Sequence, residues 1–243
     1  MKYLLDGGPP PTREGASPSP TWDESLAYLL YTSGSTGNPK PVGVTHAALA
    51  EHVHAVADLL ELTERDRVLF FASPSFDASL EELLPALVRG ATVVLRGPEL
   101  WPPADFSRIA AGLGLTVADL PTAYWRQWVR ESSSVPPSLR LVTVGGEAMP
   151  PEEARSWPTS GPAGVRLLNA YGPTEAVITA TSHEVRGTVS LGRPLPGRSA
   201  FVVDLYGQLQ PMGVAGELCL GGTLARGYPG RPDLTAERFV PDP

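Results

Sequence analysis

The stretch from Tyr31 to His46, YTSGSTGNPKPVGVTH, contains residue types that could bind phosphate. Ser, Thr and Gly lie between an apolar run and a helix-like segment, so their N–H groups and hydroxyls can converge on phosphate oxygens, and Lys40 adds a cation. The spacing is not that of a nucleotide P-loop, because Gly34 and Gly37 are three residues apart and Lys40 follows a proline. The alternative interpretation is an ordinary surface turn rich in Gly and Ser.

A second candidate, NAYGPTE, runs from Asn169 to Glu175 at the end of an apolar segment. Ligands of open α/β sheets bind beyond the carboxyl ends of strands. An aromatic ring for a base, a hydroxyl for phosphate and a carboxylate for Mg²⁺ are the groups that an ATP site needs. Alone, Y-G-P-T-E could also be a type I or II turn with proline at its second position.

Two further segments could contact a ligand. VTVGGEAMP contains Gly145 and Gly146, whose bare backbone permits close approach, although a tight strand-to-helix turn explains them too. SFDASLEELLPAL contains Asp77, which would need a cation if it were buried beside Phe76. An α-ammonium group is such a cation, and an N-cap for the following helix is the alternative.

The pattern of elements around these motifs indicates an α/β fold. Apolar, strand-like runs alternate with helix-like segments up to about residue 175, which predicts a mostly parallel sheet with flanking helices. A β-rich region over 176–243 follows, with Gly and Pro at its turns. LAYLLYT, at 26–32, is expected to be a buried strand. Residues 1–25 are expected to be a Pro/Gly/Ser-rich leader or linker in which a short strand could form.

Composition excludes several classes of protein. The 19 Lys and Arg against 26 Asp and Glu give a formal charge of −7, which argues against a nucleic-acid or anionic-membrane surface. A single cysteine, Cys219, excludes an internal disulfide and a cysteine-rich metal site. No apolar run reaches the roughly 20 residues of a membrane span, and the N-terminus does not resemble a signal peptide. A soluble cytoplasmic protein is expected.

LAYLLYTSGSTGNPK closely resembles the signature loop of the adenylate-forming (AMP-binding) enzymes, L-A-Y-x-x-Y-T-S-G-[ST]-T-G-x-P-K. That superfamily includes acyl-CoA synthetases, firefly luciferase and the adenylation domains of nonribosomal peptide synthetases. NAYGPTE, VTVGGEAMP, SFDASLEELLPAL and GELCLGGTLARGY match its later motifs in order, so the resemblance covers residues 26–243. Two departures are visible: Pro41 replaces the glycine usual after the lysine, and a glycine is missing before Leu224.

The resemblance implies a single partial large N-terminal domain over 26–243 and a set of site roles. The implied catalytic residues are Lys40, Thr174 and Glu175, with Glu175 also holding Mg²⁺. The implied ATP-binding residues are Thr32, Ser33, Gly34, Ser35, Thr36, Gly37, Gly145, Gly146, Asn169, Ala170, Tyr171 and Gly172. In amino-acid-activating members the aspartate that matches Asp77 holds the substrate ammonium group, which favours an amino-acid substrate. The segment from Gly216 to the end is expected to brace the site.

The walls of the side-chain pocket implied by the resemblance are mostly small or apolar. They are Ala78, Glu81, Ala123, Val142, Val144, Ala170, Ile178 and Thr179. Glu81 lies one helical turn after Asp77 and could face the same pocket, in which case a substrate with two amines, such as lysine or ornithine, would satisfy both carboxylates. If Glu81 instead turns toward solvent, an uncharged side chain would fill the pocket.

The implied reaction converts an amino acid and ATP into aminoacyl-AMP and then loads a carrier-protein phosphopantetheine thiol, with condensation domains as further partners. The chain has about half the length of a complete adenylation domain, and the family's Y-[RK]-T-G-D segment and lysine-bearing small domain are not in it. We therefore expect a fragment that is inactive by itself. Two alternatives remain open: an acyl- or aryl-acid ligase of the same superfamily, and an inactive fragment that acts at most as a binding module.

Overall fold

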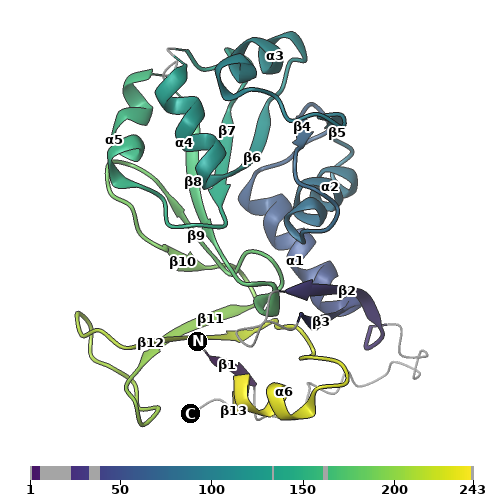
Figure 1. Ribbon diagram of the computed structural model, residues 1–243, viewed down its shortest axis with the longest axis vertical. Helices are drawn as coiled ribbons and strands as arrows, with labels where there is room; N and C mark the ends of the chain where they lie inside the picture. The colour runs from purple at the N-terminus through teal and green to yellow at the C-terminus, as the bar shows by residue number, and fades with distance from the viewer. Residues whose placement is uncertain (1, 6–22, 33–38, 133, 161–163, 242–243) are drawn as a thin grey trace. The chain divides into compact units, whose positions relative to one another are not determined.

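The computed structural model describes residues 2–5, 23–32, 39–132, 134–160 and 164–241 (Figure 1). These residues form two compact units. The first contains the described residues within 1–52, 172–180 and 194–243, and the second contains those within 53–171 and 181–193. The sequence division near residue 175 falls within the loop 172–180 of the first unit.

The second unit is built on a sheet with the strand order β10-β9-β8-β7-β6-β4-β5. Its strands are β4 (Arg67–Phe70), β5 (Thr92–Leu95), β6 (Val117–Pro121), β7 (Leu141–Gly145), β8 (Arg166–Tyr171), β9 (Thr181–Glu184) and β10 (Arg193–Pro194). The neighbours from β5 to β8 pair in parallel, and β9 pairs antiparallel to β8. The mostly parallel sheet predicted from the sequence is thereby confirmed.

Helices alternate with these strands along the chain (Figure 1). They are α1 (His46–Leu59), α2 (Ala78–Val88), α3 (Phe106–Gly112), α4 (Thr122–Glu131) and α5 (Pro151–Ser160), with a 3₁₀ turn η1 (Pro103–Asp105). Helix α1 passes from the first unit into the second.

The two faces of the sheet carry different residues. Alternate side chains of β6 and β7, including Leu120, Val142 and Val144, form one hydrophobic core with Trp125 and Trp128 of α4. Because successive side chains of a strand point to opposite faces, the residues between them face away from this core. Helix α2 lies against β4 and β5. Strand β4 leads through α2 to β5 at one edge of the sheet, whereas β6 leads through α4 to β7 in the opposite direction. Because crossovers between parallel strands are right-handed, α2 and α4 lie on opposite faces of the sheet.

The first unit is rich in strands. The hairpin β2 (Leu26–Thr32) and β3 (Lys40–Thr45) forms a two-stranded antiparallel sheet. A four-stranded sheet has the order β11-β12-β1-β13, with β1 (Lys2–Leu5), β11 (Arg198–Val203), β12 (Glu217–Gly222) and β13 (Phe239–Pro241). Helix α6 (Pro232–Arg238) and the 3₁₀ turn η2 (Thr174–Ala176) complete it. A β-rich region therefore follows the α/β part, as predicted.

The expectation that LAYLLYT is a buried strand is wrong. The segment is strand β2, but it pairs only with β3 among the described strands, and Leu26, Leu29 and Tyr31 are exposed. A continuous apolar run cannot by itself distinguish a central strand from an edge strand.

No helix among the described residues is long and apolar enough to cross a membrane.

Candidate functional site

The side chains of Lys40 and Tyr228, from distant parts of the first unit, meet at the carboxylate of Glu175. The Lys40 Nζ donates to Glu175 Oε1 at 2.8 Å and to the Tyr228 hydroxyl oxygen at 2.8 Å. The Tyr228 hydroxyl in turn donates to Glu175 Oε1 at 2.7 Å. The Lys40 Nζ also lies 4.4 Å from the centroid of the Tyr228 ring. The first and last motifs of the sequence are thus joined at Glu175.

The contact between Lys40, Tyr228 and Glu175 determines the charge states of the Glu175 carboxyl and the Tyr228 hydroxyl. Burial alone would raise the pKa of Glu175, but the hydrogen bonds from Lys40 and Tyr228, together with the lysine charge, outweigh it, and the pKa is lowered. Burial, reinforced by the bond to Glu175, raises the pKa of Tyr228 above its usual range. At neutral pH the site therefore contains an ionised carboxylate and a neutral phenol.

The donor set suits Mg²⁺ bound together with a nucleotide. Magnesium is usually held by one or two carboxylates plus substrate phosphates and water rather than by an all-protein cage. Among the residues that the structure describes, no group of three or more His, Cys, Asp or Glu could hold a metal. The buried, ionised Glu175 next to Lys40 fits the role of a single protein ligand beside a phosphate.

The loop that carries Glu175 has a strained backbone. Val177 and Ile178 have positive φ angles of 56° and 67°, which β-branched residues rarely adopt. Arg198 of β11 holds the loop, because its guanidinium donates to the carbonyls of Val177 at 3.1 Å and Thr179 at 3.4 Å. The N–H of Ala225 donates to the carbonyl of Glu175 at 2.8 Å. The surrounding strands therefore fix the position of the carboxylate.

We expect Gly172→Ala to disrupt this loop. An added Cβ would lie 2.0 Å from the carbonyl oxygen of Ile178 and 2.6 Å from the N–H nitrogen of Ala180, and both are backbone atoms that cannot rotate away. Such overpacking should lower the free energy of unfolding of the first unit by more than about 2 kcal/mol. Chemical denaturation would measure it.

Gly112→Ala in α3 is the matched control. An added Cβ at this position meets nothing within 4 Å, and alanine favours a helix by about 0.5–1 kcal/mol. Equal stability of the two variants would contradict the close packing of the loop 172–180.

The glycine-rich loop lies largely outside the described residues. Ser33, Gly34, Ser35, Thr36 and Gly37, all expected to bind the triphosphate, belong to this undescribed part. Its two ends are described, and Thr32 of β2 pairs with Lys40 of β3. The hairpin therefore brings the ends of the loop together, and Pro41 is accommodated opposite Tyr31 within it.

The nucleotide-site residues predicted in the second unit lie at the carboxyl ends of β7 and β8. The Asn169 side-chain nitrogen donates to the carbonyl of Ser190 at 2.7 Å. An added Cβ on Gly145 would approach the carbonyl oxygen of Ala170 to 3.0 Å, a tight contact, so packing favours a glycine there. Burial raises the pKa of Tyr171, which ends β8. Gly146 has a φ of 88° and open space beside it.

Residues predicted to bind the amino acid begin at the start of α2. Asp77 occupies the N-cap position, but its side chain makes no capping hydrogen bond, so the capping alternative is not supported. Asp77 and Ala78 are half-buried, whereas Glu81 is buried, with 5% of its surface exposed. The alternative that Glu81 turns toward solvent is therefore wrong.

The other predicted pocket residues are distributed more widely. Val142 and Val144 belong to the hydrophobic core that includes α4, and Ala123 is exposed near the start of α4. Ala170 is buried at the end of β8. Ile178 and Thr179 are buried in the loop 172–180 of the first unit. The described structure groups Asp77, Ala78 and Glu81 on one helix and does not by itself assemble the rest with them.

Sequence reasoning missed three polar residues. Tyr228 was treated only as part of a bracing segment, and neither Arg198 nor Asp119 of β6 was selected. The position of Tyr228 at the end of the matched motif GELCLGGTLARGY was the only available signal for it. An acidic residue inside an apolar strand was the signal for Asp119.

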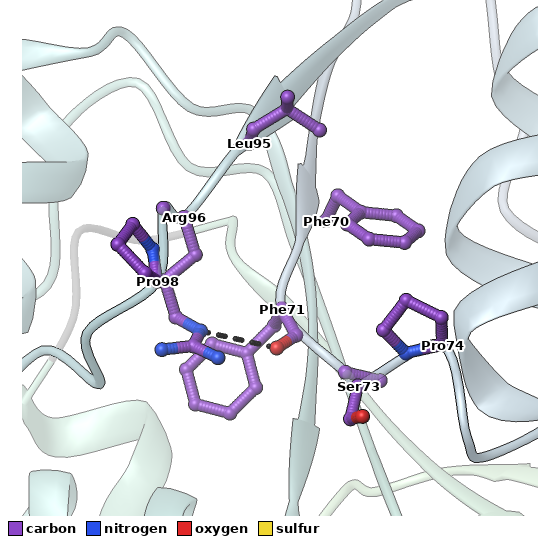
Figure 2. Close-up of a pocket in the computed structure, with 9 residues that line it drawn as sticks. Phe70, Phe71, Ser73, Pro74, Leu95, Arg96 and Pro98 are labelled. Carbon is purple, nitrogen blue, oxygen red and sulfur yellow. Dashed lines mark hydrogen bonds between the residues drawn. The ribbon is translucent and has the colours of Figure 1, made fainter.

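A separate cavity of about 350 Å³ lies at the carboxyl ends of β4 and β5 (Figure 2). Its lining is largely apolar and includes Phe70, Leu95 and Pro98. The Arg96 Nε donates to the carbonyl of Phe71 at 3.1 Å, and the guanidinium lies 5.2 Å from the centroid of the Phe71 ring. None of the residues predicted for the nucleotide or the amino acid lines this cavity.

Comparison with known proteins identifies relatives of the chain. The profile of a family described as AMP-binding enzyme matches residues 4–229. The isonitrile lipopeptide synthase of Streptomyces coeruleorubidus is 40% identical over 254 residues, which cover 98% of this chain and 16% of that protein. Bacitracin synthase 3 of Bacillus licheniformis is 41% identical over 223 residues, which cover 90% of this chain and 3% of that protein. The chain thus spans only a small part of these relatives.

Solved structures agree with this comparison. The N-terminal subdomain of Klebsiella oxytoca NpsA, in complex with 3-hydroxyanthranilyl-AMSN, matches with a TM-score of 0.79 and 30% identity, over 90% of this chain and 55% of that one. NpsA was also solved with 3-hydroxybenzoyl-AMSN and as an artificially fused adenylation–PCP di-domain. The AMPPNP-bound form of the nonribosomal peptide synthetase FmoA3 matches with a TM-score of 0.81 and 28% identity, over 90% and 24% of the two chains.

Proposed function

Because the chain belongs to the AMP-binding enzyme family, we propose that it is part of a nonribosomal peptide synthetase adenylation domain that activates an amino acid with ATP. The products are aminoacyl-AMP and pyrophosphate, and the aminoacyl group is then transferred to the phosphopantetheine thiol of a carrier protein. Condensation domains are the further partners of such a synthetase. The contact of Lys40, Tyr228 and Glu175 is the observation that carries this proposal.

The chemistry needs charge stabilisation more than proton transfer. A substrate carboxylate with a pKa near 4 is already ionised at pH 7, so no general base is required. Lys40 places a cation beside the phosphates, where charge moves onto the leaving pyrophosphate. Glu175 would hold Mg²⁺, which neutralises phosphate charge when it is bound. Thr174, next to Glu175 in η2, would add a hydroxyl to the phosphate site.

Asp77 supports an amino acid as the substrate. Asp77 is a half-buried carboxylate at the start of α2 that does not cap the helix, and the α-ammonium group of an amino acid is a suitable cation for such a carboxylate to bind. The name of one relative, the isonitrile lipopeptide synthase, refers to a peptide product. An aryl-acid ligase is the second candidate, because NpsA was solved with aryl-AMSN compounds.

We expect ATP–pyrophosphate exchange by a complete adenylation domain that carries this sequence to depend on an α-amino group. Amino acids should support exchange, and the corresponding acids without the amino group should be at least about a hundredfold poorer, because they lack the ammonium group that Asp77 would bind. Asp77→Asn should reduce this discrimination. Equal rates with both kinds of acid would favour the aryl- or acyl-acid candidate.

The 243-residue chain by itself is the control for that experiment. It matches 55% of the NpsA N-terminal subdomain, so we propose that activity needs parts of the domain beyond those present here. The isolated chain should support no appreciable exchange with any amino acid. Robust exchange from the purified chain would contradict this proposal.

A further inference from the structure

The guanidinium of Arg198, at the start of β11, makes four hydrogen bonds within the first unit. Its Nη2 donates to the carbonyl of Val177 at 3.1 Å, and its Nε donates to the carbonyl of Thr179 at 3.4 Å. Its Nη1 donates to the carbonyl of Thr223 at 2.6 Å, and its Nη2 also lies 3.0 Å from His52 Nδ1. Because a guanidinium can only donate, that imidazole nitrogen accepts the bond. One half-buried side chain therefore bonds to three separate segments of the chain.

Each of these segments leads to one member of the site formed by Lys40, Glu175 and Tyr228. The first two carbonyls belong to the loop that carries Glu175. Thr223 precedes Tyr228 by five residues. His52 belongs to α1, which begins directly after β3, the strand that carries Lys40. The guanidinium therefore connects the parts of the chain from which all three residues of the site project.

The loop that carries Glu175 needs such support because its backbone is strained. Val177 and Ile178 have positive φ angles of 56° and 67°, and residues in this region persist only where their surroundings hold them there. Hydrogen bonds from an ionised donor are stronger than those between neutral groups. The rigid fork of an arginine also reaches several acceptors at once, whereas a lysine donates from a single point. Since Glu175 lies two residues before Val177, a change in this backbone would move its carboxylate.

We propose that Arg198 is a positioning residue, which sets the place of the Glu175 carboxylate for Mg²⁺ by holding the backbone of the loop 172–180. This inference rests on the proposed function, in which Glu175 is the protein ligand of Mg²⁺ beside the nucleotide. Mg²⁺ demands near-ideal octahedral geometry, so a displaced carboxylate binds it less well. Arg198 acts through Glu175 and not on the phosphates. Its loss should therefore raise the Mg²⁺ concentration that the site needs and should change the rate at saturating Mg²⁺ much less.

The test measures ATP–pyrophosphate exchange of the complete adenylation domain, with its preferred amino acid, as the Mg²⁺ concentration is varied. Arg198→Met should raise the Mg²⁺ concentration for half-maximal exchange by about tenfold, with kcat at saturating Mg²⁺ and ATP within about twofold of the wild type. Arg198→Lys keeps the charge but loses the fork, so its Mg²⁺ requirement should be intermediate. Arg231→Lys is the matched control and should behave as the wild type, because this exposed arginine bonds to the nearby side chain of Asp233.

A double-mutant comparison tests whether Arg198 acts through Glu175. In a Glu175→Gln background, Arg198→Met should cause no further rise in the Mg²⁺ requirement, because the carboxylate that it positions is already absent. Independent effects of the two substitutions would overturn the proposal. His52→Leu removes one of the four acceptors, so it should raise the Mg²⁺ requirement less than Arg198→Met does.

Equilibrium binding supplies a readout without turnover. When no amino acid is present, Mg²⁺ should strengthen the binding of ATP less in Arg198→Met than in the wild type, as measured by calorimetric titration. The melting temperature reports whether each variant is folded, and Arg198→Lys takes the same test if Arg198→Met does not fold. An unchanged Mg²⁺ dependence in a variant that only melts earlier would overturn the proposal, because Arg198 would then act on stability alone. Absence of exchange by the wild type with every amino acid would contradict the proposed function, and the binding measurement would still decide the role of Arg198.

Discussion

Replacing Lys40 or Glu175 by alanine should lower ATP–pyrophosphate exchange of the complete domain by about a hundredfold or more when ATP is limiting. Lys40→Ala removes a cation from the proposed phosphate site and leaves the Glu175 carboxylate, which is 6% exposed, without its ion-pair partner. Glu175→Ala removes the proposed Mg²⁺ ligand, so the Mg²⁺ concentration needed for half-maximal exchange should also rise. The measurement is the initial rate of exchange as ATP and Mg²⁺ are varied separately.

Two further variants separate catalysis from packing. Tyr228→Phe keeps the ring against Lys40 and removes only the hydroxyl that donates to Glu175, so its effect should be smaller than that of either alanine variant. Glu237→Ala, in the exposed part of α6, should leave exchange unchanged. Wild-type rates for both Lys40→Ala and Glu175→Ala at limiting ATP would show that the phosphate site is assigned wrongly.

The sequence was sufficient to select Lys40 and Glu175, but not to show how they interact. They lie 135 positions apart, and each was selected through its own motif. Their direct contact depends on the hairpin β2–β3 meeting the loop 172–180, which a local pattern does not encode. Tyr228 was missed for the same reason, because a tyrosine in a strand-rich region is usually a packing residue, and only its partner reveals its role.

Strand positions were predicted well because local composition determines them. The runs that became β4 to β8 are short, apolar and separated by helical segments, a pattern typical of a covered parallel sheet. LAYLLYT has the same composition but occupies a two-stranded hairpin, since pairing partners are a tertiary property. The face of the sheet to which each side chain points also could not be predicted from local composition. Val142 and Val144 were grouped with Glu81 by motif, whereas the register places the intervening Thr143 on the side of α2.

The second unit should lose stability as the pH rises from about 5 to 8. Burial raises the pKa of Glu82 to about 8, more than the backbone N–H groups of Ala72 and Phe71 and the charge of Arg96 can offset. An acid whose pKa is higher in the folded state binds more protons there. Its stabilising effect is complete below pH 4.5, the usual pKa in an unfolded chain, and is lost as pH rises through the folded value.

The expected change is large. The difference between the pKa of about 8 in the folded protein and the usual value of 4.5 corresponds to a loss of about 5 kcal/mol in the free energy of unfolding across the titration. Burial raises the pKa of Asp119 as well, so it acts in the same direction. The carboxyl of Asp66 has the opposite effect on stability, but in a different pH range. Although burial opposes the shift, hydrogen bonds, mainly from Arg140, lower its pKa to about 2, so that its contribution is lost only in acid.

Chemical denaturation of wild type and Glu82→Gln at pH 5 and pH 8 measures this effect. The fluorescence of Trp101, Trp125, Trp128 and Trp157 reports on the second unit, which contains all four. Glutamine is uncharged and keeps one oxygen to accept the N–H of Phe71, so the variant should lose much less stability between the two pH values and should exceed the wild type at pH 8. Glu152→Gln, an exposed change in the first turn of α5, should retain the wild-type dependence. Asp119 should leave a smaller residual dependence in Glu82→Gln. A dependence as large as that of the wild type would mean that the carboxyl of Glu82 stays ionised in the folded protein across this range, stabilised by the two backbone N–H groups that it accepts.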